Sequence, residues 1–206
     1  MRRFYLIFMA SLVALSACNS ARKPSGTTFT KAINEYLAKH GEACTVIGRQ
    51  FPIAVPRSDQ GEQYGIGPKL AALEQAGLVQ ATETTAVVHG MLDPLRGSTP
   101  PQPVKRYELT TDGKKYFQQI PGTLGQASGF CYGQKSVDSI VKWTGPATVG
   151  TEVTYTWRIV GLASWAERSD VQQAFPDIRT KVNGVLKTTE VAGLQLTSQG
   201  WEVLGQ

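Results

Sequence analysis

The first eighteen residues constrain this chain most, because they decide in which compartment the rest of it folds. Arg2 and Arg3 precede an apolar run from Phe4 to Leu15, and two small residues follow that run. A positively charged start, a short apolar segment and small residues before a cleavage point are the parts of a secretory signal. The apolar run is shorter than the roughly 20 residues that a membrane-spanning helix needs. We therefore expect residues 1–17 to be a signal peptide.

The segment Leu15-Ser16-Ala17-Cys18 resembles the lipobox of bacterial lipoproteins. In that family the cysteine thiol is diacylated, the signal is cut before the cysteine, and the new amine is acylated. The resemblance implies that Cys18 is the lipidation site, carries palmitate-type acyl chains and anchors the protein to a membrane in the cell envelope. Asn19 stands where an aspartate would favour the inner membrane, so the resemblance points to the outer membrane, facing the periplasm. A plain signal peptide with a chance cysteine is the alternative.

The cysteine count fits an oxidising compartment. The chain has three cysteines, and lipidation of Cys18 leaves Cys44 and Cys131. Disulfides persist outside the cytosol, and two cysteines can pair in only one way. We expect a Cys44–Cys131 disulfide; two independent buried thiols are the alternative.

The charge balance is mild. The formal net charge of +5 falls to +3 once Arg2 and Arg3 leave with the signal. The chain has no block of Lys and Arg of the kind that binds nucleic acid, so we expect no nucleic-acid partner. Residues 18–28 are polar and contain Pro and Gly, which is typical of a flexible tether.

The first half of the body mixes helices and strands. Apolar spacing predicts a helix over Thr30–His40 and another that starts at Pro68 and ends before Gly77. Extended segments are expected at 79–88 and 104–109, followed by a turn or short helix at 110–117.

The segments PKLAALEQAGLV and KRYELTTDGKKYF, within residues 68–117, resemble part of a winged-helix domain as found in the MarR and PadR regulators. In those families the helix before the wing reads bases in the major groove. Here that helix offers Lys69, while Ala71 and Gln75 are poor DNA readers. We expect a winged-helix-like α+β subdomain over residues 29–118 that does not act on DNA.

The second half is predicted to be a mainly antiparallel β subdomain with one helix, over residues 130–206, after a linker at 119–129. Alternation predicts strands at 137–143, 153–159, 190–196 and 201–204. Ser164 and Glu167 match a capping box for a helix over 165–175. The fold class is therefore α+β. The pattern Leu-Thr-x-x-Gly occurs twice, at 109–113 and 196–200. It is either an internal repeat or a coincidence between two turns that both favour Thr and Gly.

The sequence contains no catalytic constellation that we can name. His40 and His89 have no metal-ligand partners at helical spacing, and the nucleophile motifs of hydrolases are missing. No two carboxylates are placed by their spacing as the acid and base of a glycosidase. We therefore predict no catalytic residue, no metal ligand and no cofactor.

Aromatic residues concentrate in the second half. Trp143, Tyr155 and Trp157 lie on the apolar sides of alternating strands, which favours the core. Trp165 near a helix start and Trp201 beside a hairpin turn are the candidate partner-binding residues.

These features predict a lipid-anchored envelope protein that binds a protein or cell-wall partner without catalysis. The alternatives are a hydrolase that acts on an envelope polymer and, if the lipobox is false, a winged-helix DNA-binding protein.

Overall fold

The computed structural model describes residues 22–62, 65–88, 100–122, 125–145 and 147–205. Cys18 and His89 lie outside these residues. The chain is an α+β protein whose strand pairs are antiparallel, as predicted. Within the described residues, every helix is too short or too polar to cross a bilayer.

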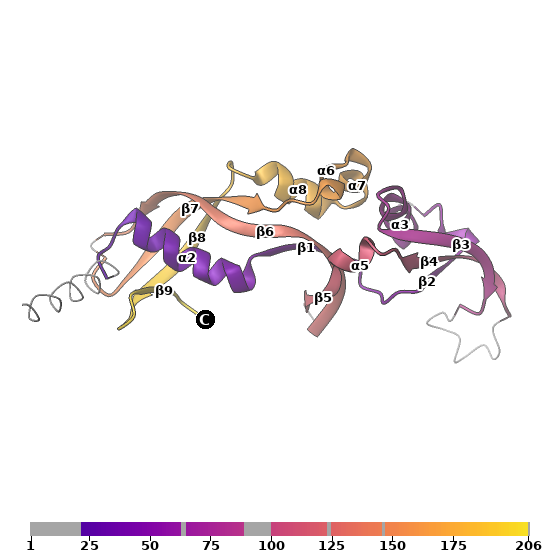
Figure 1. The fold of residues 1–206 in the computed structure, drawn as a ribbon, viewed down its shortest axis with the longest axis horizontal. Helices are drawn as coiled ribbons and strands as arrows, with labels where there is room; N and C mark the ends of the chain where they lie inside the picture. Colours follow the sequence, from indigo (N-terminus) through magenta and orange to yellow (C-terminus); the bar gives the residue numbers. More distant parts are fainter. Residues whose placement is uncertain (1–21, 63–64, 89–99, 123–124, 146, 206) are drawn as a thin grey trace, which may run out of the picture. The chain divides into compact units, whose positions relative to one another are not determined.

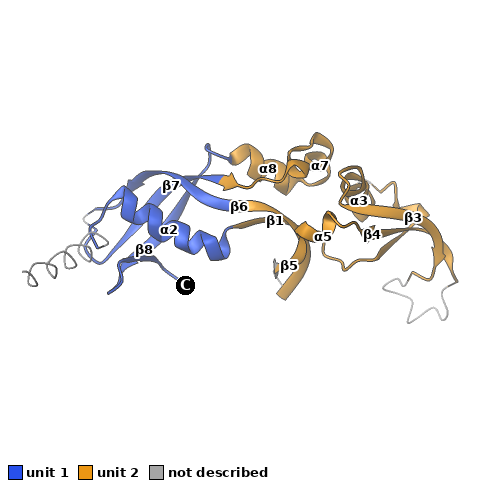
Figure 2. Ribbon diagram, viewed as in Figure 1, with its two compact units in different colours: residues 1–41, 135–158, 185–206 blue, residues 42–134, 159–184 orange. Residues whose placement is uncertain are grey.

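The chain forms two compact units (Figure 2), and neither is one continuous stretch of sequence. Unit 1 contains residues 1–41, 135–158 and 185–206, and unit 2 contains residues 42–134 and 159–184. The division therefore differs from the expected boundary at residues 119–129, because two long strands contribute residues to both units.

Unit 1 packs one helix against an antiparallel sheet (Figure 1). The helix is α2 (Gly26–His40), and the strands in order are β6 (Gly125–Trp143), β7 (Gly150–Val160), β8 (Thr189–Leu196) and β9 (Trp201–Val203). Helix α2 begins four residues before the predicted start, because Ser25 and Thr28 form a capping box.

The alternation predicted for the strand at 153–159 is confirmed in β7. Val153, Tyr155 and Trp157 are buried, while the residues between them are exposed or half-buried. This one-sided burial is what period-two patterning produces in a sheet with one covered face.

In unit 2, β6 is flanked by β1 (Glu42–Val46) and β5 (Phe117–Gly122). The prediction of a linker at 119–129 is wrong. Gln119 pairs with Ser128 and Ile120 with Ala127 in a β5–β6 ladder. Gly and Ser in this segment allow close backbone approach instead: a Cβ on Gly129 would lie 2.4 Å from the carbonyl oxygen of Thr45.

A second sheet in unit 2 has the order β2 (Ile53–Pro56), β4 (Gln102–Leu109) and β3 (Val79–Ala86). The short 3-10 helix η1 (Arg57–Asp59) and helix α3 (Ile66–Gln75) lie between β2 and β3 in the chain. Helix α3 ends as predicted: Leu78 N–H donates to the Leu73 carbonyl and Gly77 N–H to the Glu74 carbonyl, which is the Schellman pattern.

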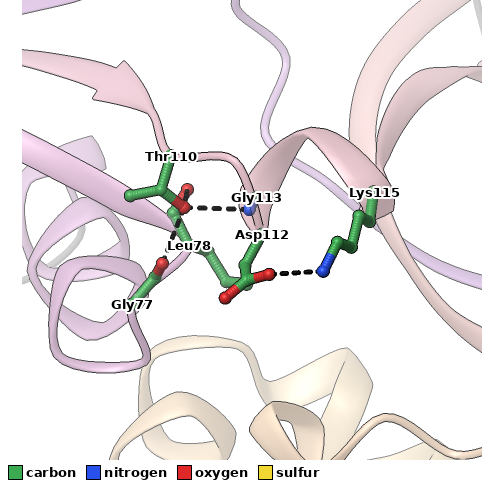
Figure 3. Close-up of polar contacts among 6 residues, drawn as sticks. All are labelled: Gly77, Leu78, Thr110, Asp112, Gly113 and Lys115. Carbon is green, nitrogen blue, oxygen red and sulfur yellow. Dashed lines mark hydrogen bonds and ion pairs between the residues drawn. The ribbon is translucent and has the colours of Figure 1, made fainter.

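The first Leu-Thr-x-x-Gly segment joins the end of β4 to the turn after α3 (Figure 3). The Thr110 hydroxyl donates to the Gly77 carbonyl at 2.7 Å and accepts from Gly113 N–H at 2.9 Å. Gly113 opens the short helix α5 (Gly113–Tyr116), and a Cβ there would lie 1.8 Å from the Leu78 carbonyl oxygen. The glycine is therefore required by contact with backbone.

The second Leu-Thr-x-x-Gly segment forms a different turn. Thr197 N–H donates to the Gly200 carbonyl at 2.8 Å, and Gly200 has a φ of +126° in the connection between β8 and β9. The two segments thus share a sequence pattern but not a structure: the first lies at the start of α5 and the second in the turn between β8 and β9. They are therefore not a structural repeat.

The helix predicted over 165–175 is broken in two. Helices α6 (Ser164–Glu167) and α7 (Ser169–Ala174) are separated by Arg168, whose backbone is extended, and α8 (Pro176–Gly184) follows. The capping-box prediction is wrong, because the N-cap is Ala163 and no side chain caps the helix. These helices and α3 bury the core of unit 2 around Leu70, Phe130 and Phe175.

Candidate functional site

A groove of unit 2 lies between α3 and α7 and holds about 600 Å³. The two helices are in contact. One wall comes from α3 and the residue before it, and the other comes from α7 and the start of α8. The lining residues are Gly65, Pro68, Lys69, Ala71, Ala72 and Gln75 on the first wall, and Asp170, Gln173, Ala174 and Pro176 on the second.

The spacing of apolar residues orients α3 in this groove. Leu70 and Leu73 are fully buried and fix one side of the helix in the core. Ala71 and Gln75 therefore turn toward the groove, since residues one and two positions along lie on another face of a helix. Small side chains at this wall leave the space that the groove occupies.

Asp170, on the second wall, hydrogen-bonds to Arg168, the residue that separates α6 from α7. Its two carboxylate oxygens accept from Arg168 Nε at 3.0 Å and Nη2 at 2.8 Å, and one also accepts from Val171 N–H. The hydrogen bonds from Arg168 lower the pKa of Asp170 below its usual value. A carboxylate held ionised in this way is a poor general acid.

The other polar side chains that line the groove, Lys69, Gln75 and Gln173, form no ion pair with a described carboxylate. The Lys69 ammonium lies 5.5 Å from the centre of the Phe175 ring, and no described carboxylate pairs with it. The side-chain amides of Gln75 and Gln173 make no hydrogen bond with other described residues. The groove thus offers one cation and two amides, which suit hydrogen bonding to a polar chain.

A second lysine, Lys105 on β4, is held in an ion pair with α3. Lys105 Nζ on β4 lies 2.7 Å from Glu74 Oε2, and the hydrogen bond to Glu74 raises the pKa of Lys105. Because Lys105 is paired with Glu74 of α3, this helix and β4 make a weak surface for a phosphate backbone.

The two cysteines expected to pair lie directly opposite each other on β1 and β6. The structure joins Cys44 Sγ to Cys131 Sγ at 2.02 Å, in agreement with the predicted disulfide. Gln118 Nε2 donates to Glu42 Oε1 at 2.8 Å beside the bridge, and Lys181 Nζ donates to the Cys44 carbonyl. Both sulfurs are used in the bond, so this cluster is structural.

The prediction that Trp165 is a surface residue is wrong. Its side chain is 5% exposed and lies among three aromatic rings, with centroids 5.8 Å from Tyr116, 6.2 Å from Phe130 and 5.9 Å from Tyr132. A position at a helix start is no guide to exposure when that helix covers the core.

The same correction applies to Trp201, which is 4% exposed. Its ring lies 5.1 Å from Phe29, and its Nε1 donates to the Arg22 carbonyl at 3.1 Å. Because β9 is covered by α2, the apolar side of this short strand faces inward.

Two further residues complete the comparison with the sequence. Trp143, expected in the core, is 43% exposed, because it is the last residue of β6 and lies at the end of the sheet. His40 ends α2 and is exposed, with its ring 4.7 Å from Tyr36.

The groove itself was not predicted from the sequence. Lys69 and Gln75 were recognised on α3, but Gln173 comes from α7, about 100 residues later. The signal present in the sequence was the pair of small side chains Ala71 and Ala72 on α3, which leaves space beside the helix. Comparison of the chain with protein-family models, characterised proteins and solved structures finds no match.

Proposed function

We propose that this protein is a lipid-anchored component of the bacterial envelope that binds a protein or cell-wall partner in the groove between α3 and α7, without catalysis. The anchor is Cys18, on the resemblance of residues 15–18 to a lipobox. The proposal places the protein at the outer membrane, facing the periplasm.

One observation carries the binding role. Lys69, Gln75 and Gln173 line a groove of about 600 Å³ and have no polar side-chain partner among the described residues. Their hydrogen-bonding capacity is therefore available to a ligand, while Asp170, the one described carboxylate of the lining, is held by Arg168. Pockets with a few convergent polar groups are the usual binding sites of proteins.

We also propose that residues 68–117 belong to a winged-helix-like module used for protein binding. The support is the order of elements: helix α3, the hairpin β3–β4, and β2 paired with β4 as a third strand. A module of this kind is free to act off DNA, because fold and function are separable.

Site-specific photocrosslinking tests the groove. A photoreactive amino acid at Gln75 should form an adduct in living cells, since this residue lines the groove. The same amino acid at Gln80, an exposed residue of β3 outside the groove, is the matched control. Adducts of equal yield at both positions, or at neither, would contradict the groove as the binding site.

Metabolic labelling tests the anchor. Cells given an alkyne palmitate should label the wild-type protein, and Cys18→Ser should abolish the label. A label that survives this substitution, or a precursor that keeps residues 1–17, would contradict lipid anchoring.

A further inference from the structure

Unit 1 exposes two large apolar side chains at one end of its sheet. Trp143, the last residue of β6, is 43% exposed, and Val149, just before β7, is 74% exposed. They lie at the two ends of the connection between β6 and β7. A hydrogen bond from Thr144 N–H to the Glu152 carbonyl joins the two sides of this connection. We call Trp143 and Val149 the apolar tip.

The exposed indole is held rigidly. The Trp143 ring meets Phe29 edge to face with centroids 5.4 Å apart, and Phe29 is fully buried and packs in turn on Trp201. One side of the Trp143 ring is therefore fixed by the core of unit 1, while the other is open to the surroundings. A rigid exposed aromatic residue loses little conformational freedom on binding.

Three basic residues lie at this end of unit 1. Arg22 lies against the turn between β8 and β9: its Nη1 donates to the Thr197 carbonyl, and its own carbonyl accepts from Trp201 Nε1. Lys23 follows Arg22, and Lys142 precedes Trp143; all three cations are exposed. None of them has an ion-pair partner among the described residues of unit 1, where Lys31 pairs with Glu35 and Lys135 pairs with Glu190.

The start of the described chain places this end of unit 1 close to the proposed anchor. Cys18 precedes Arg22 by four residues, and four residues span at most about 14 Å even when fully extended. If Cys18 carries acyl chains, the backbone at Arg22 is confined to the neighbourhood of the bilayer surface.

We propose that the apolar tip docks on the lipid surface to which Cys18 is attached, a step that rests on the proposed lipid anchor. Trp143 and Val149 enter the interfacial layer, and Arg22, Lys23 and Lys142 face anionic headgroups. Tryptophan favours this layer because its ring is apolar and its N–H is polar. Cations beside it are attracted by the negative surface potential of anionic lipids.

A chemical tether tests the docking without relying on acylation in the cell. A chain that begins at Cys18 keeps every described residue, and Cys18 is its one free thiol because Cys44 and Cys131 are bonded. Coupling this thiol to a maleimide lipid, in vesicles of equal parts phosphatidylglycerol and phosphatidylethanolamine, reproduces the anchor. Brominated acyl chains in the same vesicles then quench tryptophans that reach the bilayer.

Trp143 is the exposed one of the four tryptophans, since Trp157, Trp165 and Trp201 are buried, and the quenching that Trp143→Phe removes is assigned to it. We expect quenching of the wild type, loss of the quenched component in Trp143→Phe, and a reduction of about twofold or more in Val149→Ser. Val191→Ser, which removes a 63% exposed side chain of β8, is the matched control and should quench like the wild type.

Two results would overturn the proposal. One is a confirmed tether with no quenching of Trp143, which would point to a protein as the occupant of the tip. The other is equal quenching in the wild type and Val149→Ser, together with full dependence on phosphatidylglycerol, which would leave only electrostatic attraction of the cations. Both results are independent of whether cells acylate Cys18.

Discussion

Cys44 and Cys131 are direct register partners on the antiparallel strands β1 and β6, 87 residues apart in the sequence, and a disulfide joins them. The bond lies in unit 2, where β6 is also paired with β5. It therefore links the first strand of that unit to its central strand.

The first prediction concerns this bond. Replacing both residues, Cys44→Ser with Cys131→Ser, removes the closure of a long loop and should lower the free energy of unfolding by about 4 to 5 kcal/mol on the chain-entropy model. Urea denaturation of the oxidised wild type and the double variant measures the difference. Two alkylatable thiols in the native protein, or equal denaturation midpoints, would contradict the prediction.

The second prediction concerns Gly113. In Gly113→Ala the new Cβ meets the Leu78 carbonyl oxygen, so α5 must shift, and we expect a loss of about 2–3 kcal/mol in stability. Gly61→Ala is the control, because nothing lies within 4 Å of a Cβ there. Thermal unfolding compares the two, and a similar melting temperature for both variants would refute the steric argument.

The third prediction concerns the edge of β6 beside α2. Asn34 Oδ1 accepts from Val137 N–H at 2.8 Å and from the Ser136 hydroxyl at 3.2 Å. Asn34→Ala leaves this backbone donor without its partner and should cost about 1–3 kcal/mol. Asn34→Asp keeps an acceptor oxygen and should cost less. Chemical denaturation ranks the variants, and an alanine variant as stable as the aspartate variant would show that the contact is unimportant.

The fourth prediction concerns the titration of Tyr155. Burial raises the pKa of this phenol, and the nearby Glu190 carboxylate, which accepts from its hydroxyl at 3.1 Å, raises it further. Because the folded-state pKa exceeds the unfolded value of about 10, this group's contribution to stability is complete below pH 10 and is lost as the pH rises above it.

Phenolate absorbance checks the assignment. The folded wild type should ionise fewer tyrosines near pH 10 than the unfolded chain does, and Tyr155→Phe should remove one of the late steps. Tyr107 and Tyr132 also have a pKa raised by burial and should remain late in that variant. A wild type whose tyrosines all ionise together near pH 10 would contradict the burial argument.

Local sequence patterns determined much of the secondary structure. The alternation of Val153, Tyr155 and Trp157 specified one covered face of β7, and Gly77 specified the end of α3. Both features depend on neighbours within a few residues, where side-chain periodicity and backbone freedom decide the outcome. The cysteine count restricted the disulfide to one pair for a similarly simple reason.

Local composition and short motifs predicted secondary structure less reliably at residues 119–129 and 164–168. The Gly- and Ser-rich stretch 119–129 resembled a linker but forms the β5–β6 ladder, where Gly129 admits the close approach of the Thr45 carbonyl. Ser164 and Glu167 matched a capping box, yet Arg168 adopts an extended backbone and divides the helix. In the first case backbone pairing decided the outcome, and in the second Arg168 is held by Asp170 two residues along the chain.

The sequence by itself determined the α+β class, the positions of most strands and the one available cysteine pair, because these depend on short-range periodicity and on counting. Tertiary structure alone decided which tryptophans are buried, how the two units share β6, and that α3 and α7 enclose a groove. Burial and groove formation depend on contacts between segments about 100 to 180 residues apart, and no local pattern records which segments will meet.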